Sequence, residues 1–299
     1  MSKIGTKKKN DLQPGEVKRR TRTQEILVQY RRNKGAMVSL IILLVMLVIL
    51  VFAQFYYDFE TDICQVTTNV LAKSSWEHPF GTDHLGRDVL ARLLYGGRWS
   101  LLLAACSTII SVGLGTLYGA IATYIGGRVE NIMFRIVDAI MMIPSLLMVI
   151  VLIIALGPST PNLILAMSIG GMPHSARLAR STILPIRDSD YVESARAIGV
   201  SGTRILFSHI LPNSVSPLIV SATMRLGNNI IHVATYSFLG LGVAKPIPEW
   251  GTMLSEARDF LFVRPELIFY PGIMILIFTL LFNLIGDGLR DALDPKLKR

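Results

Sequence analysis

The chain has 299 residues, of which 51% are hydrophobic and 17% are charged, and its apolar residues come in blocks of about twenty. An ordinary soluble domain is excluded, because it needs more charge than this to cover its surface. The net charge is +9, and eleven Lys or Arg lie in the first 34 residues, directly before an apolar stretch. This pattern is typical of the cytoplasmic flank of a membrane helix and argues against a nucleic-acid partner.

The sequence divides into five parts. Residues 1–35 predict a basic cytoplasmic tail, and residues 36–55 a retained transmembrane helix whose charged flank is too long for a cleaved signal peptide. Residues 56–98 are polar and predict an extracytoplasmic loop. Residues 99–290 form the core membrane domain, and residues 291–299 a cytoplasmic tail. Within the core, the predicted membrane helices cover residues 99–125, 132–156, 162–180, 214–238 and 267–285, with a second polar loop at 240–266.

These patterns predict an all-α integral membrane protein with about six transmembrane helices. An even number of helices places both termini on one side of the membrane. Basic residues gather in the N-terminal tail, in residues 177–204 and in the C-terminal tail, and six helices bring all three to the same side. By the positive-inside rule, this side is the cytoplasm.

Two local features of the predicted helices bear on packing. Gly115 and Gly119 are four residues apart, a spacing that lets two helices approach closely, either within the chain or in a dimer contact. Pro144 lies in the middle of the third predicted helix, where a kink is expected. Arg135 and Asp138 are three residues apart on the same helix, and we expect them to form an ion pair.

Residues 187–212 are too polar to span a membrane and predict two short cytoplasmic helices, 191–198 and 203–211. Asp190 is the expected N-cap of the first helix, with Glu193 completing a capping box, and Gly199 is its expected stop. Pro212 is expected to end the second helix. The exposed side of this projection is expected to offer Tyr191, Ala195 and Ile198. Small and apolar side chains there suit insertion into a partner's groove, although a well-capped cytoplasmic loop is the simpler interpretation.

The stretch 193–199, reading ESARAIG and followed by Leu211 and Pro212, resembles the EAA loop of ABC-importer permeases. Ser194 departs from the family's first Ala, and His209 stands where Ile is frequent. Further segments resemble the dipeptide/oligopeptide (peptide/nickel) importer subfamily, and the resemblance covers residues 30–299. They are HPFGTD at 78–83 with GRD at 86–88, RIVD at 135–138 with Pro144 and Ser145, SFLGLG at 237–242, and GDGLRDALDP at 286–295.

The resemblance implies the type I importer permease fold in a bacterial inner membrane. The chain would be the membrane-spanning permease subunit of an ATP-driven importer, with peptides as the expected cargo and glutathione or nickel left open. Its implied partners are a second related permease subunit, two ATP-binding subunits, an extracytoplasmic substrate-binding protein and membrane lipid. The loop would dock on the ATP-binding subunits, with coupling expected at Tyr191, Glu193, Ala195, Ala197 and Gly199.

No lysine directly follows a glycine, so the chain has no phosphate-binding loop of the G-K-[ST] type. We therefore expect no cofactor on this chain, and ATP and Mg on the partner subunits. No catalytic set of Ser, His, Asp or Cys is evident, so the chain is expected to be a transporter subunit and not an enzyme. His78, Asp83, His84 and Asp88 make a metal site conceivable, but the family motifs explain three of them, and no metal is predicted.

One face of the fifth predicted helix is polar. Spacings of three, four and seven residues place its polar side chains in one row, and charges inside a bilayer face protein or a water-filled cavity. We expect this face to line the translocation path, or else to pair with neighbouring helices. Its members are Arg225, Asn228, Asn229 and His232. The Glu that the family commonly shows near Val233 is absent, and Arg225 is a candidate to attract a substrate carboxylate.

Two other functions remain open from the residues. An ion-coupled secondary transporter would need no ATPase, but it normally carries acids within its membrane helices. The first, second, fourth and fifth predicted helices carry none. A structural membrane scaffold is the third reading, which transport by the assembled complex would exclude.

Overall fold

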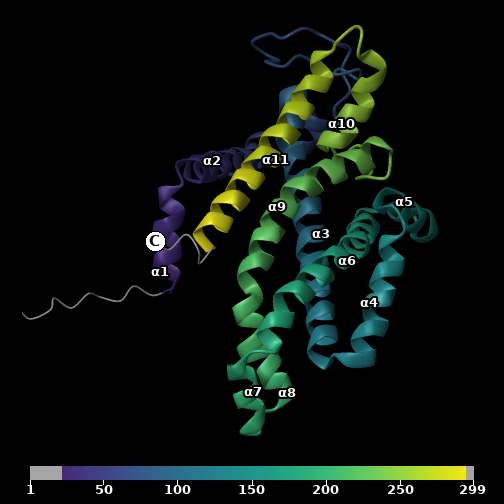
Figure 1. Ribbon diagram of the computed structural model, residues 1–299. Helices are drawn as coiled ribbons and strands as arrows, with labels where there is room; N and C mark the ends of the chain where they lie inside the picture. The colour runs from purple at the N-terminus through teal and green to yellow at the C-terminus, as the bar shows by residue number, and fades with distance from the viewer. Residues whose placement is uncertain (1–21, 294–299) are drawn as a thin grey trace, which may run out of the picture.

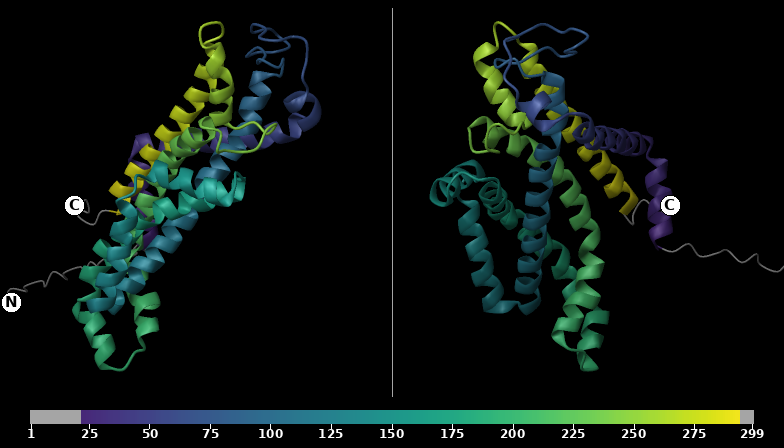
Figure 2. Two further views of the ribbon diagram at one scale, coloured as in Figure 1. Left: turned by 90° about the vertical axis from the view of Figure 1, so that its right-hand side faces the viewer. Right: turned by 180° about the vertical axis from the view of Figure 1, so that it is seen from behind.

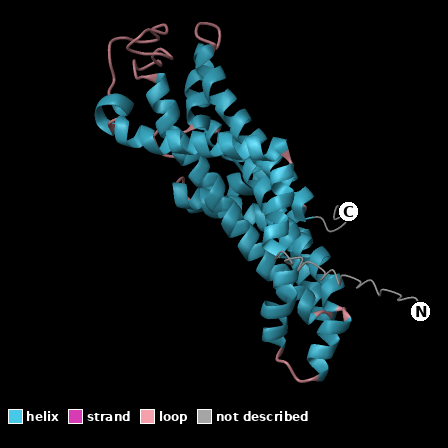
Figure 3. Cartoon of the chain, turned by 90° about the vertical axis from the view of Figure 1, so that its left-hand side faces the viewer, coloured by secondary structure: helices cyan, strands magenta, loops and turns pink. Residues whose placement is uncertain are grey.

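The computed structural model describes residues 22–293, and over this range the chain is helical apart from its loops (Figures 1 and 3). The described part contains no β-strand, only an isolated bridge between Thr82 and Asp88. The prediction of an all-α integral membrane protein is confirmed. Most of the basic tail 1–35 and of the tail 291–299 lies outside the described residues.

The helices follow one another along the whole described range. Short π-helical segments cover Phe59–Cys64 and Ile205–Ile210, and a 3-10 turn covers Arg258–Phe260. The α-helices are α1 (Arg22–Arg32), α2 (Lys34–Tyr56), α3 (Val89–Ile125), α4 (Gly127–Met141), α5 (Ser145–Leu156), α6 (Thr160–Arg187), α7 (Asp190–Ala197), α8 (Gly202–Arg204), α9 (Leu211–Phe238), α10 (Trp250–Ala257) and α11 (Glu266–Leu293).

Fewer helices than predicted are long and apolar enough to cross a membrane. Within the described range four qualify: α2, α3, the continuous helix Gly202–Phe238, and α11. The bent pair α4 and α5 makes a fifth if it counts as one span. The expected fourth span corresponds to α6, which is 28 residues long but contains Pro173, Pro185 and several basic residues. Its polarity, not its length, separates it from the other spans.

Two predicted boundaries are wrong, each for a local reason. α3 begins at Val89, ten residues before the predicted start, because the Asp88 carboxylate caps it by accepting a hydrogen bond from the Ala91 amide at 2.7 Å. The expected loop 56–98 therefore ends earlier. The predicted helix 132–156 is not merely kinked but broken: α4 and α5 meet at 89°, with extended backbone at Pro144.

Glycines allow α3 and α6 to pack closely. A Cβ atom on Gly115 would come within 2.5 Å of the Met172 carbonyl oxygen, and one on Gly119 within 2.4 Å of the Ala176 carbonyl oxygen. Gly113, on another side of the same helix, has open space around it. The small-residue face of α3 therefore packs within the chain, which was one of the two expectations; the other was a dimer contact.

The predicted second loop, 240–266, is in fact largely folded into the protein. It contains α10, whose first residue, Trp250, is fully buried and donates from its indole nitrogen to the Leu93 carbonyl oxygen of α3 at 3.0 Å. The preceding Glu249 carboxylate caps α10 by accepting hydrogen bonds from the Gly251 and Thr252 amides. The same carboxylate accepts a 2.7 Å hydrogen bond from the Ser100 hydroxyl of α3. α10 is therefore held against α3 by both apolar and polar contacts.

Residues 189–210, which we call the knob, project at the end of the molecule opposite α10 (Figures 1 and 2). Ser189, not Asp190, is the N-cap of α7, and no side-chain capping bond forms, so the expected capping box is wrong. Gly199 has φ of +82°, which confirms the predicted turn. The second knob helix does not end at Pro212: it continues through a π-helical segment into α9, because Pro212 sits in the first turn of α9.

Candidate functional site

A cavity of about 720 Å³ lies between α5, α6 and α9 and the end of α11. All four residues of the polar face predicted on α9 line it, namely Arg225, Asn228, Asn229 and His232. Their common side follows from helical spacing, as the sequence indicated, whereas the facing walls come from other elements. The volume lies within the range of cavities that hold small molecules.

The Arg225 side chain of α9 contacts α6 at the wall of the cavity. Its Nη1 donates to the Gly171 carbonyl oxygen at 3.3 Å, which is its one hydrogen bond to the described residues. Its Nε is buried and has no partner in the described part of the chain. No ion pair joins this guanidinium to any described carboxylate. The sequence left open that Arg225 pairs with a neighbouring helix. In the structure this pairing is a single, long hydrogen bond to a backbone carbonyl oxygen.

The other polar residues of this face divide into anchored and free side chains. Asn229 donates from Nδ2 to the Thr108 hydroxyl of α3 at 2.8 Å, so its amide ties α9 to α3. His232 is exposed within the cavity wall and stacks near the Tyr236 ring, with ring centroids 6.3 Å apart. Asn228 is exposed and makes no hydrogen bond with a described residue.

The structure adds two cavity residues that the sequence did not single out. His174 of α6 and Arg290 of α11 both line the same space. Both lie far from α9 in the sequence, and no local pattern connects them with it. No Asp or Glu belongs to the described cavity lining, so the charge that this cavity presents is positive.

The knob shows which of its predicted contact residues are accessible. Ile198 is 81% exposed and Tyr191 46% exposed, and Glu193, Ala197 and Gly199 also lie on the surface. Ala195 does not: it is buried and packs inward, so its predicted exposure is wrong. The reason is the α-helical period, because the buried positions of α7 are Val192 and Ala195, three residues apart.

These inward residues give the knob its own small core. Val192 and Ala195 pack in a cluster with Ile205 and Ile210 of the following segment and with Ile183 of α6. The Tyr191 hydroxyl receives a hydrogen bond from the Asn213 amide at 3.4 Å. The knob is thus attached to α6 and α9 by packing, and a displacement of α7 would move the ends of both helices.

Ion pairs also join α4 to α6. Glu130 of α4 is buried, and its Oε1 lies 2.7 Å from Arg180 Nε of α6. Its Oε2 lies 3.6 Å from Arg187 Nη1 of the same helix. The expected ion pair between Arg135 and Asp138 does not form. Asp138 pairs instead with Arg177 of α6, at 2.6 Å. Helix α4 is therefore bound to α6 by charges whose partners are more than thirty residues apart in sequence.

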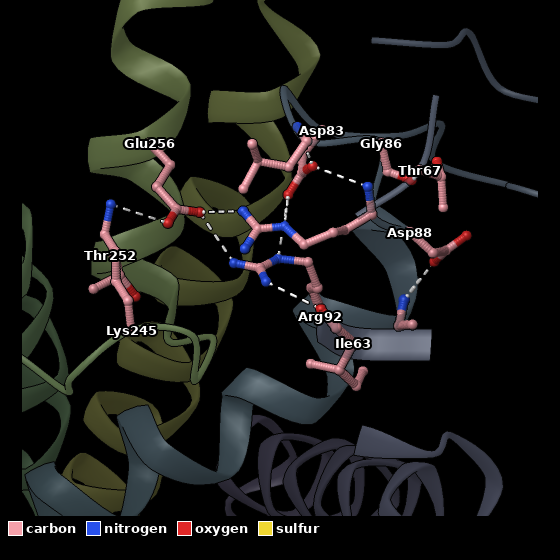
Figure 4. A network of polar contacts seen from close by, with 12 residues as sticks. Ile63, Thr67, Asp83, Gly86, Asp88, Arg92, Lys245, Thr252 and Glu256 are labelled. Carbon is pink, nitrogen blue, oxygen red and sulfur yellow. Dashed lines mark hydrogen bonds and ion pairs between the residues drawn. The ribbon is translucent and has the colours of Figure 1, made fainter. Parts of the chain in front are cut away.

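At the opposite end, charged side chains from three segments converge in what we call the ion-pair cluster (Figure 4). Arg87 Nε lies 2.7 Å from Asp83 Oδ2, and its Nη2 lies 2.9 Å from Glu256 Oε2. Arg92 Nη2 lies 3.0 Å from the same Glu256 oxygen, and Lys245 Nζ lies 3.3 Å from Glu256 Oε1. The two arginines are only 4% and 2% exposed.

The ion-pair cluster gives a structural reason for the motifs at 78–83 and 86–88. Asp83 also accepts hydrogen bonds from the amides of Leu85 and Arg87 and so shapes the loop before α3. Asp83, His84 and Glu256 approach one another as metal ligands would. Both carboxylates already face buried guanidinium groups, which disfavours a cation there. The cluster therefore joins the loop, α3 and α10 by charge.

Comparison with known proteins assigns the chain to a family. Residues 111–299 match the family described as the binding-protein-dependent transport system inner membrane component. Residues 21–73 match the N-terminal transmembrane domain of oligopeptide transport permease C. The chain belongs to this family of transport-system membrane components. The resemblance inferred from the EAA-like loop is thereby confirmed.

Relatives of known sequence extend over nearly the whole chain. The dipeptide transport system permease protein DppC of Alkalihalophilus pseudofirmus is 41% identical over 278 residues, covering 92% of this chain and 90% of that protein. The oligopeptide transport system permease protein OppC of Bacillus subtilis is 38% identical, with the same coverage. The glutathione transport system permease protein GsiD of Escherichia coli O157:H7 is 39% identical, covering 93% of this chain and 92% of that protein.

The fold also matches a solved transporter. The inward-facing methionine ABC transporter MetNI superposes with a TM-score of 0.56 and 18% identity, over 69% of this chain and 98% of the matched chain. At this level of identity the match concerns the fold alone. Together, family and fold make the chain a membrane-spanning permease component of a transport system.

Proposed function

We propose that this chain is one of two permease subunits of an ATP-driven peptide importer in a bacterial inner membrane. The observation that carries the proposal is the placement of two features on one framework: a cavity lined by the polar face of α9 and a projecting knob packed against α6 and α9. The relatives named for dipeptide, oligopeptide and glutathione transport support small peptides as the cargo class.

The proposed partners are those that the family implies. The sequence has no phosphate-binding loop of the G-K-[ST] type, in agreement with ATP and Mg on two separate ATP-binding subunits. The second related permease subunit would close the open side of the cavity. An extracytoplasmic substrate-binding protein would deliver the peptide at the α10 end. This orientation places the knob and both termini in the cytoplasm, in agreement with the basic residues of the tails and of 177–204.

Coupling would run from the ATP-binding subunits through the knob to the cavity. Tyr191 and Ile198 offer the exposed contact face, with Glu193 and Ala197 beside them, and Gly199 permits the turn. Ala195 acts from inside by holding α7 against the following helix. Movement of the knob would tilt α6 and α9, whose residues form two walls of the cavity, and so open the path alternately to each side.

Copurification from native membranes tests the assembly. A tagged chain is expected to bring down an ATPase, a second related permease and, with substrate present, a soluble binding protein. Ile198→Asp places a charge on an exposed apolar position and is expected to lose the ATPase while keeping the second permease. Phe262→Asp, at a 98% exposed position at the opposite end, is the matched control and should retain the ATPase.

An ion-coupled secondary transporter is the alternative function that this experiment separates. Recovery of the chain alone, in a form that still transports in liposomes without ATP, would reject the importer. The absence of any Asp or Glu from the described cavity lining supports the importer, because ion-coupled carriers use such acids. Equal ATPase recovery with wild type and Ile198→Asp would reject the knob as the coupling contact.

A further inference from the structure

We propose that the cavity contains a carboxylate-binding subsite, centred on Arg225, that takes the C-terminal carboxylate of the transported peptide. This inference rests on the proposed function, because it names the chemistry that the same cavity recognises. The observation behind it is a guanidinium group that lies within a membrane helix and faces a cavity, yet has no anionic partner among the described residues.

Arg225 has fewer polar partners than three arginines on α3 and α6. Arg92 faces the Glu256 carboxylate at 3.0 Å, and Arg180 faces the Glu130 carboxylate at 2.7 Å. Arg98 has no carboxylate partner, but it donates to Gln54 Oε1 at 2.6 Å and to the Tyr95 hydroxyl at 2.8 Å. Arg225 has only the Gly171 carbonyl oxygen at 3.3 Å, and its Nε is a buried donor without an acceptor. A guanidinium forms two parallel hydrogen bonds with a carboxylate, and charge-assisted bonds of this kind are stronger than the single bond seen here.

The surroundings of Arg225 favour an anion and disfavour a cation. His174, His232 and Arg290 line the same cavity, while no described acid does. Asn228 lies one turn from Arg225 on the same face, and its amide is available as a second donor. A peptide's ammonium group finds no countercharge here, so the subsite distinguishes the two ends of a peptide.

The rest of the wall suits peptide side chains of varied shape. Val149, Met167, Val220 and Tyr236 present apolar surface around the polar row. Such a cavity has one directional polar contact and otherwise adaptable walls. A transporter that must accept many sequences can therefore read the terminal carboxylate, which every unmodified peptide has, without reading the side chains.

Binding to the assembled complex, purified without its substrate-binding protein, tests the subsite. Radiolabelled trialanine is the probe, and unlabelled trialanine, trialanine amide and inorganic phosphate are the competitors. Wild type is expected to prefer the free acid over the amide by about tenfold, the effect of one charge-assisted contact. Phosphate should compete poorly. Arg225→Gln should remove the preference and Arg225→Lys should keep part of it.

The control variant is Arg128→Gln, which removes an exposed cation outside the cavity and should leave the preference unchanged. Equal competition by acid and amide in wild type, an unchanged preference in Arg225→Gln, or no measurable binding of trialanine would each overturn the subsite. Displacement by phosphate as effective as by trialanine would show a general anion site and also overturn it. Each complex is first checked for its ATPase and second permease, so a failure of assembly counts against the proposed function instead.

Discussion

The ion-pair cluster holds buried arginines and the cavity holds the partly buried Arg225, and the two regions differ in what faces those arginines. In the cluster, Arg87 and Arg92 share the carboxylates of Asp83 and Glu256, and their charges are compensated within the chain. In the cavity, Arg225 has a single carbonyl partner. Compensated charge joins segments into a rigid unit, whereas uncompensated charge facing a cavity is available to a ligand.

The largest expected effect comes from breaking the ion-pair cluster. Arg92→Met leaves the largely buried Glu256 and Asp83 carboxylates with one guanidinium fewer, and removal of one partner of a buried pair costs roughly 3–5 kcal/mol. We expect a strongly lowered melting temperature of the purified complex and little recovery from membranes. Arg258→Gln, which removes a pair with more than half of each side chain exposed, is the control and should change stability by about 1 kcal/mol or less.

Replacing Arg225 in the cavity should not destabilise the complex, in contrast to replacing Arg92. Arg225→Met removes a desolvated charge that lacks a counter-ion, so the melting temperature should stay the same or rise. An arginine at the centre of a lipid-embedded helix costs about 2.5–3.5 kcal/mol, and hydration of the cavity makes the gain here smaller. Uptake of free peptides should nevertheless fall. A destabilisation comparable to that of Arg92→Met would show that Arg225 has a structural partner and would remove the contrast between the two regions.

Glu249 is an intermediate case, a buried carboxyl that has hydrogen-bond donors but no ion-pair partner among residues 22–293. Burial raises its pKa above the ordinary 4.5, although the Gly251 amide and the Ser100 hydroxyl act in the opposite direction. Stability from this group is therefore fully present below pH 4.5 and is lost as the pH rises through the raised pKa. Glu249→Gln keeps a neutral acceptor and should abolish this part of the pH dependence with little other change. Melting curves of wild type and variant across the acid-to-neutral range should converge at low pH; parallel curves would contradict the raised pKa.

The smallest effect is expected at an exposed pair beside the knob. Two hydrogen bonds from Arg187 lower the pKa of Asp188, whose side chain is more than half exposed. Its contribution is present above about pH 3.8 and is lost as the pH falls through the lowered pKa. Asp188→Asn should leave the melting temperature within error at neutral pH and should not alter ATPase recovery. A clear loss of ATPase would instead place Asp188 in the coupling contact.

The accuracy of the sequence predictions follows the range of the interactions involved. The turn at Gly199 and the shared face of Arg225, Asn229 and His232 depend on neighbouring residues, and both appear as expected. The capping box at Asp190 failed because α7 begins one residue earlier than predicted, with Ser189 as its N-cap. The stop at Pro212 failed because this proline lies in the first turn of α9, which continues from the π-helical segment. Only the coupling and translocation roles of these residues stay predictions.

By itself the sequence determined the membrane class, the family and the row of polar residues on α9, since hydropathy, motif order and helical period are properties of neighbouring residues. The tertiary structure decided which charges are compensated. Glu256 meets Arg87 and Arg92 across more than 160 positions of the chain, while Arg225 meets no acid at all among the described residues. Such pairings depend on how distant helices pack, because charge acts over distances in space that bear no fixed relation to separation along the chain.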